Sequence, residues 1–341
     1  MSNTGGESIF GRAIDVHGHM IPQQLFEENH NRLESAGVSV EKSPTGETFL
    51  LNGDHRLGPI QAGMSSVSKR LEWMDERGIF NQWVSPGTGL FTWTSFDESQ
   101  ARIWYELVNS SILEAAKSSN GRLSPLVALY LGDPERAAAE LKNMVNDNKL
   151  TGVFLSTHPL ECGSLADPPL WPFWSAVERL GVPVMLHPPT NGPSCQITPV
   201  VLQNITGRLI DTTSIAAEML LNDFFSRFPN VKIILVHGGG MLPYQIFRMD
   251  GLNRAGLVPQ SIGGRAFTDD IRNFYYDTVA LDSISLEFLL KRVGAGKVLL
   301  GSDAPFTIAD PDPVGRVLAA EITYADQEDI CCNNASRLAL H

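Results

Sequence analysis

The sequence predicts a (β/α)8 TIM barrel with a small flap inserted after the first strand. Short apolar runs that suit buried strands recur eight times, and helical patterns lie between them. No glycine-rich phosphate-binding motif follows the first run, so nothing favours an open doubly wound sheet. The length of 341 residues fits one barrel domain, residues 1–341, with insertions.

Eight strands are expected in chain order. Most are nearly continuous apolar runs, which are typical of parallel strands that helices cover on both faces. The expected strands are residues 12–19, 80–87, 123–132, 150–158, 182–189, 231–240, 273–281 and 297–306.

Helical patterns occupy the intervals between these strands. Apolar residues recur at positions i, i+4 and i+7 within residues 65–78. Asp133 and Pro134 suit the N-cap and first position of another helix. A further helix is expected within residues 283–294, and the chain from about residue 312 should form helices that close the bottom or side of the barrel.

The insertion covers about residues 20–64. Within it, Asn52-Gly53 is a hairpin-turn signal, so residues 47–60 are expected to form two short strands. We expect these strands to form a flap over the mouth of the barrel.

Composition restricts the class of partner. A net charge of -12 argues against nucleic acid, and an anionic substrate would need locally placed arginines. No apolar run is long enough to span a membrane, and the polar start of the chain resembles no secretory signal. The 4 cysteines show no metal-finger spacing and two are adjacent, which favours a reducing, cytoplasmic location.

Ionisable side chains gather at the expected C-terminal ends of strands, which meet at the active-site face of a parallel barrel. A single histidine at a strand end is more often structural than a ligand, but a gathering of this size favours a metal site. His17 and His19 are two residues apart and therefore point the same way, so both can bind one ion. Imidazole and carboxylate ligands suit Zn²⁺. The gathered residues are His17, His19, His158, His187, His237 and Asp303.

The motifs DVHGH, LHPP, VHGGG and GSDAPF together resemble the amidohydrolase superfamily, over about residues 13–306. Within it they resemble the decarboxylase branch typified by aminocarboxymuconate-semialdehyde decarboxylase. The resemblance implies one divalent ion per subunit, usually Zn²⁺, with Mn²⁺ left open. A second ion is not expected, because the end of the fourth strand reads LSTHP and lacks the lysine that bridges two metals in hydrolytic relatives.

The resemblance also implies roles for individual residues. His237 would act as an acid and base beside the ion, together with Asp303. The implied metal ligands are His17, His19, His187 and Asp303.

Two arginines extend the resemblance. Arg56 in GDHRLG corresponds to a flap arginine that holds a substrate carboxylate, and Arg248 to an arginine that reaches into the neighbouring subunit's site. An arginine binds a carboxylate bidentately and stays charged. The assignment of Arg248 implies a homodimer. The alternatives are a solvated flap residue for Arg56 and a surface helix residue for Arg248.

Other positions remain open. His158 either contacts the substrate or only shapes the pocket, and Trp93 either lines the pocket or packs on its own scaffold. Asp15 is expected to orient a neighbouring residue or to cap the strand end rather than to bind metal. Pro188-Pro189 stands where the family decarboxylase has a tryptophan, and the loop of residues 190–199 has no counterpart, so the substrate stays undetermined.

These observations predict a metal-dependent, non-oxidative decarboxylase, a C–C lyase that releases CO2. Its substrate would be a small unsaturated or aromatic, dicarboxylic acid such as a muconate semialdehyde. The alternative is a metal-dependent hydrolase or hydratase on the same barrel, which would consume water without releasing CO2. A third reading is a binding protein in which the metal is only structural, and loss of metal without loss of turnover would favour it.

Overall fold

The computed structural model describes residues 8–91, 96–147, 150–258 and 265–339. Its main sheet has eight parallel strands whose order follows the chain. The strands are β1 (Ala13–Met20), β5 (Ile79–Pro86), β6 (Leu123–Val127), β7 (Gly152–Ser156), β8 (Pro183–His187), β9 (Lys232–Leu235), β10 (Tyr275–Asp277) and β11 (Val298–Leu299).

The first and last strands meet and close the barrel. The Val16 N–H donates to the Leu300 carbonyl at 2.8 Å, and the Asp303 N–H donates to the His17 carbonyl, also at 2.8 Å. The predicted (β/α)8 barrel is therefore confirmed.

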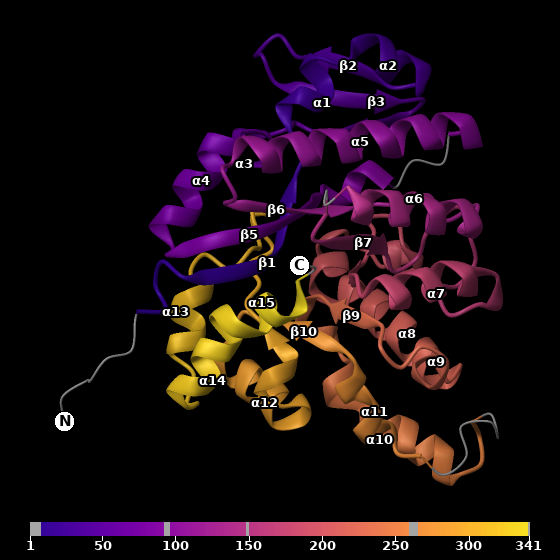
Figure 1. The fold of residues 1–341 in the computed structure, drawn as a ribbon, viewed down its shortest axis with the longest axis vertical. Coiled ribbons are helices and arrows are strands. Elements are labelled where there is room, and N and C mark those ends of the chain that lie inside the picture. The colour runs from indigo at the N-terminus through magenta and orange to yellow at the C-terminus, as the bar shows by residue number, and fades with distance from the viewer. Residues whose placement is uncertain (1–7, 92–95, 148–149, 259–264, 340–341) are drawn as a thin grey trace.

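Helices surround the strands (Figure 1). The longest, α5, starts with a capping box in which Asp97 and Gln100 each bond the other's backbone N–H. The main outer helices are α4 (Val67–Glu76), α5 (Glu98–Ser118), α6 (Pro134–Asn146), α7 (Trp171–Leu180), α8 (Arg208–Leu221), α10 (Leu242–Arg254) and α12 (Ser283–Val293), with the short α9 (Phe224–Arg227) and α11 (Phe267–Asp270) beside them.

The barrel interior holds one apolar cluster to which most strands contribute a side chain. The C-terminal part of the chain forms α13 (Pro313–Leu318), α14 (Tyr324–Glu328) and α15 (Asn334–Leu338). Ala335 and Leu338 of α15 pack into this cluster, so the expected closing role of the last helices is confirmed. In the described residues, every helix is too short or too polar to span a bilayer. The strand residues of the cluster include Val16, Trp83, Leu126, Phe154, Met185, Ile234 and Leu299.

Several strands are shorter than predicted, which changes where the ionisable side chains stand. His158, His237 and Asp303 lie beyond the ends of β7, β9 and β11, in connecting segments. His237 and Asp303 adopt left-handed backbone conformations, with φ of 55° and 65°. This region is uncommon for residues other than glycine, and such conformations cluster at functional sites.

The insertion has more structure than predicted. Its elements are α1 (Gln23–Glu27), α2 (His30–Ser35), β2 (Ser39–Lys42), β3 (Thr48–Asn52), β4 (His55–Leu57) and α3 (Ala62–Ser65). The hairpin turn is Gly53-Asp54 rather than Asn52-Gly53, because Asn52 pairs with His55 across the ladder. The third strand, β2, was not predicted.

The position of the insertion also differs from the expected flap over the mouth. It packs beside α5 (Figure 1). Its apolar side chains, such as Leu25 and Leu50, form a separate buried cluster with Trp104 and Leu107 of α5. Burial of this apolar face fixes the insertion against the helix, and none of its described residues lines the cavity at the barrel mouth.

Candidate metal centre and active-site cavity

His17 is held by a carboxylate beneath it. The imidazole Nδ1 lies 2.6 Å from Oδ2 of Asp277, which ends β10, and both side chains are fully buried. The other carboxylate oxygen accepts the N–H groups of Gly238 at 2.8 Å and Val279 at 3.1 Å. With its proton on Nδ1, His17 presents the lone pair of Nε2 to the site.

His19 is oriented in a similar way by a hydroxyl group. Its Nδ1 lies 2.7 Å from Oγ of Ser85 on β5. Its Nε2 lies 3.0 Å from Nε2 of His17, and both nitrogens lie 3.2 Å from Oδ1 of Asp303. Two imidazole nitrogens and a carboxylate oxygen at these separations can share one cation.

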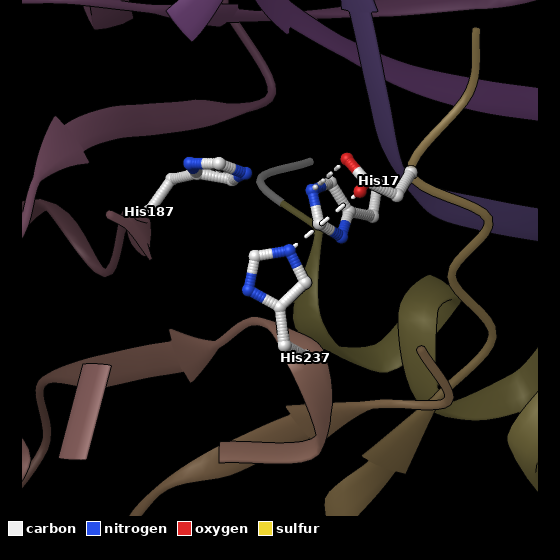
Figure 2. A group of neighbouring side chains, drawn as sticks. His17, His187 and His237 are labelled. Atoms are coloured by element: carbon white, nitrogen blue, oxygen red, sulfur yellow. Dashed lines mark ion pairs between the residues drawn. The ribbon is translucent and has the colours of Figure 1, made fainter. Parts of the chain in front are cut away.

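His187 and His237 complete the group, and Figure 2 shows the rings of His17, His187 and His237 facing one another. The Nδ1 of His187 lies 2.8 Å from the Pro188 carbonyl. Its Nε2 is buried and makes no hydrogen bond to the described residues, as is also true of Oδ1 of Asp303. The Nε2 of His237 lies 3.6 Å from Oδ2 of Asp303. One ligand atom from each of His17, His187, His237 and Asp303 lies within 4.8 Å of the others.

The protonation of His19, His187 and Asp303 suits a divalent cation. Burial alone would lower the pKa of His17, but Asp303 and Asp277 raise that pKa despite the burial. Burial lowers the pKa of His19 to about 4, and burial together with the neighbouring imidazoles holds the pKa of His187 well below its usual range. Burial alone would raise the pKa of Asp303, but the histidines around it, His17 first, bring that pKa well below its usual range. Neutral imidazoles and an ionised carboxylate are the forms that bind metal. The donor set therefore fits one divalent ion, with one donor more than a tetrahedral site uses.

Asp15 faces away from this group, into a buried polar network. Its carboxylate accepts the Ser302 N–H at 3.0 Å and the Gln82 side-chain amide at 2.6 Å. Gln82 in turn accepts from Arg70 at 2.6 Å, and Arg70 donates to the His19 carbonyl at 2.7 Å. The network therefore holds the backbone that carries the two histidines of β1, which agrees with the expected orienting role of Asp15.

A cavity of about 1140 Å³ opens above the group. Its floor includes His187, His237 and Asp303, and its walls are largely apolar. This size admits a small aromatic acid. The wall residues include Ile205, Leu209, Tyr244, Val279, Leu281, Ile284, Phe288, Leu289, Phe306 and Ile308, together with Arg208.

The other predicted site residues lie elsewhere. Arg56 pairs with Glu41 at 2.9 Å and stacks on Phe49, with its guanidinium carbon 3.4 Å from the ring centroid. Arg248 is exposed on α10. His158 is partly buried, and its Nδ1 lies 2.9 Å from Oγ1 of Thr157. None of the three is among the described residues that line the cavity, and Trp93 lies outside the described residues.

The chain matches the amidohydrolase family over residues 14–338. It is a member of that family. A 2-amino-3-carboxymuconate-6-semialdehyde decarboxylase of Dictyostelium discoideum is 28% identical over 328 residues, covering 94% of this chain and 90% of the relative. A gamma-resorcylate decarboxylase of Polaromonas is 28% identical over 338 residues, covering 95% and 98%.

A solved structure supports the same grouping. The 2,6-dihydroxybenzoate decarboxylase from Rhizobium has a TM-score of 0.76 and 25% identity to this amidohydrolase, over 96% of this chain and 98% of the other. The predicted resemblance to the decarboxylase branch of the superfamily is therefore confirmed, and with it the prediction of an enzyme, a carboxy-lyase.

Sequence reasoning missed three residues of the site. Asp277 and Ser85 belong to apolar runs that predict strands, and a polar residue within such a run is the signal that the sequence offers. Arg208 lies far from any strand end, so the pattern that identified the histidines could not identify it.

The contact of Asp277 with His17 predicts a defect in metal affinity. In Asp277→Asn, the amide no longer holds the Nδ1 proton of His17 by charge, and the ring loses its fixed orientation. We expect metal affinity to fall roughly 10- to 100-fold, with activity recovered at high metal concentration. Metal titration of the purified variant measures this. Asp269→Asn, which alters an exposed carboxylate on α11, is the matched control and should behave as wild type.

Proposed function

We propose that this amidohydrolase is a metal-dependent, non-oxidative decarboxylase of an aromatic or unsaturated carboxylic acid. The carrying observation is the convergence of four histidines and Asp303, of which His187, His237 and Asp303 line a largely apolar cavity. The named activities of the two relatives, which act on conjugated carboxylic acids, support the same reaction.

The proposed metal is a single Zn²⁺ per subunit, with Mn²⁺ as the alternative. His17, His19, His187 and Asp303 would hold it. The buried Nε2 of His187 and Oδ1 of Asp303, which make no hydrogen bond to the described residues, support this assignment, as does the 3.2 Å separation of that oxygen from Nε2 of both His17 and His19. A divalent ion held there would supply a positive charge to stabilise the negative charge that develops on the substrate.

The residues of the chain would then position the substrate and move one proton. The bond between the substrate carbon and its carboxylate breaks, CO2 leaves, and the electron pair stays on the carbon. His237 lines the cavity, and its Nε2 lies 3.6 Å from Oδ2 of Asp303. From this nitrogen it would deliver a proton to that carbon. The apolar walls exclude water and favour loss of charge from the carboxylate.

Release of CO2 tests this proposal. The metal-loaded protein is incubated with gamma-resorcylate and, separately, with 2-amino-3-carboxymuconate-6-semialdehyde, and CO2 and substrate are both measured. We expect stoichiometric CO2, its loss after treatment with a chelator, and its return on addition of ZnCl2 or MnCl2. Consumption of substrate without CO2 would instead support the alternative hydrolase or hydratase.

We also propose that the active form is a homodimer in which Arg248 acts in the partner's site. Arg248 shares α10 with Tyr244 and Phe247, whose side chains are exposed at 76% and 53%. A partner subunit that covered this face would bury both rings, and Tyr244 also lines the cavity. An arginine beside them on the same helix would then reach a neighbouring site.

Mixed inactive chains are expected to recover activity if Arg248 acts across subunits. Arg248→Ala and His237→Ala damage different sites of a mixed dimer, so one intact site forms and roughly a quarter of wild-type activity should return. The control mixture of Asp303→Asn with His237→Ala should recover none, since both residues belong to the same cavity. Failure of the first mixture to exceed the control would remove Arg248 from the site. CO2 release measures both.

A further inference from the structure

Arg208 brings a positive charge to the cavity that no role described above uses. It is the first residue of α8 and lines the same cavity as His187, His237 and Asp303. Among the lining residues that the structure describes, it is the only arginine or lysine.

The guanidinium is anchored on one side. Its Nη1 donates to the carbonyl of Pro189, two residues after His187, so Arg208 is tied to the segment that carries a metal-ligand candidate. A guanidinium has five N–H donors, and this contact leaves the others for a ligand.

The nearest acidic residue on the same helix is engaged elsewhere. Asp211 is buried, and its carboxylate accepts the backbone N–H of Ser194 at 3.1 Å and the Ser194 hydroxyl at 2.7 Å. These bonds fix the loop of residues 190–199 to α8. In the described part of the chain, Arg208 forms no ion pair with a carboxylate, so its charge is left without a direct counterion.

The surroundings of Arg208 select the kind of anion. Ile205 and Leu209 lie beside it in sequence and line the cavity with it, and Ile284 and Phe288 of α12 contribute to the same walls. A partly buried cation against apolar walls suits a ligand that is flat and apolar with one anionic end, because that end would neutralise the cation. A carboxylate matches the fork of an arginine.

We propose that Arg208 binds a carboxylate of the substrate and so sets the preference of this site for anionic over neutral ring compounds. This inference rests on the proposed function for the identity of the cavity as the substrate site. Under this proposal Arg208, and not Arg56, is the carboxylate-binding arginine within the subunit, since Arg56 pairs with Glu41 away from the cavity.

Two probes of nearly equal shape test the proposal. Benzoate and benzamide are titrated calorimetrically into metal-loaded wild-type protein, Arg208→Gln and Arg208→Lys. In Arg208→Gln the Kd of benzoate should rise roughly 10- to 100-fold, because a charge-assisted pair is lost. The Kd of benzamide should change less than about 3-fold. Arg208→Lys keeps the charge but loses the fork, so the affinity for benzoate should be intermediate.

Arg136→Gln is the matched control, because Arg136 is an exposed arginine on α6 that pairs with Glu140. Its two Kd values should equal those of wild type. An unchanged ratio of the benzoate and benzamide Kd values in Arg208→Gln would overturn the proposal, and so would an equal loss of both ligands, which would indicate that Arg208 only supports the Pro189 segment. If Arg208→Gln fails to fold or to retain metal, the same ratio in Arg208→Lys decides, and a wild-type ratio there counts against the proposal.

Failure of this inference is distinguishable from failure of the proposed function. Release of CO2 by the wild type tests the decarboxylase, whatever the Kd ratio of the variant. If the wild type releases CO2 and Arg208 proves to be the carboxylate-binding residue, Arg208→Gln should also raise KM more than it lowers kcat. A variant that lost kcat alone would contradict the binding role.

Discussion

Asp303→Asn is expected to abolish CO2 release, with kcat/KM reduced at least about 10³-fold, and to lose the bound divalent ion. Asp303 contributes the only carboxylate to the group of five donors, and its Oδ1 lies 3.2 Å from Nε2 of both His17 and His19. The asparagine has nearly the same shape but no charge, so it leaves a divalent ion facing neutral ligands alone. Metal analysis of the purified variant and a CO2 assay measure the two effects.

A matched variant separates this effect from a general change in charge. Asp75→Asn removes an exposed carboxylate that pairs with Arg122, and it should keep both metal and activity. Thermal unfolding of each variant in the presence of metal checks that the barrel still forms. Asp303→Asn with a full complement of metal and normal kcat/KM would exclude Asp303 from the proposed centre.

His237→Asn is expected to keep its metal and to lose turnover. If His237 supplies the proton, kcat should fall by about 10²- to 10⁴-fold while KM changes little. The reason is its position, since its ring lines the cavity and its Nε2 stands 3.6 Å from Asp303, farther than the nitrogens of His17 and His19. Steady-state kinetics and metal analysis measure these outcomes.

The companion variant His19→Asn decides which four of the five donors hold the ion. In the wild type the Nε2 of His19 lies 3.0 Å from the Nε2 of His17, so we expect His19→Asn to lose metal. The opposite pattern, with metal lost from His237→Asn and retained by His19→Asn, would make His237 a ligand and would require another proton donor.

The barrel was predictable because its strands are buried on both faces, which leaves a clear apolar signal in the sequence. His17, His19, His187 and His237 were predictable because they interrupt or end those runs, and the structure brings these four together, whereas His158 stays outside the cavity lining. Their division into ligands and proton donor stays a prediction, since His237 lies as close to the group as a ligand would.

The arginines were not predictable in the same way. Whether Arg56 faces the cavity depends on how the insertion packs, and that is decided by a cluster shared with Trp104 and Leu107 of α5, far along the chain. Arg208 reaches the cavity because α8 begins there, which requires the loop before it to be placed first. Asp277 matters only through its contact with His17 on a distant strand. Each of these depends on tertiary contacts that local patterns do not report.

The seam between β1 and β11 has a consequence for folding. His17 and Asp303 come from the two ends of the sheet, and the Asp303 N–H bonds the His17 carbonyl across the join. An ion bound by both side chains would stabilise the closed barrel, because opening of the barrel would separate the two residues that bind the ion. Free metal should therefore protect the folded form by mass action, and depletion of metal should weaken this seam first.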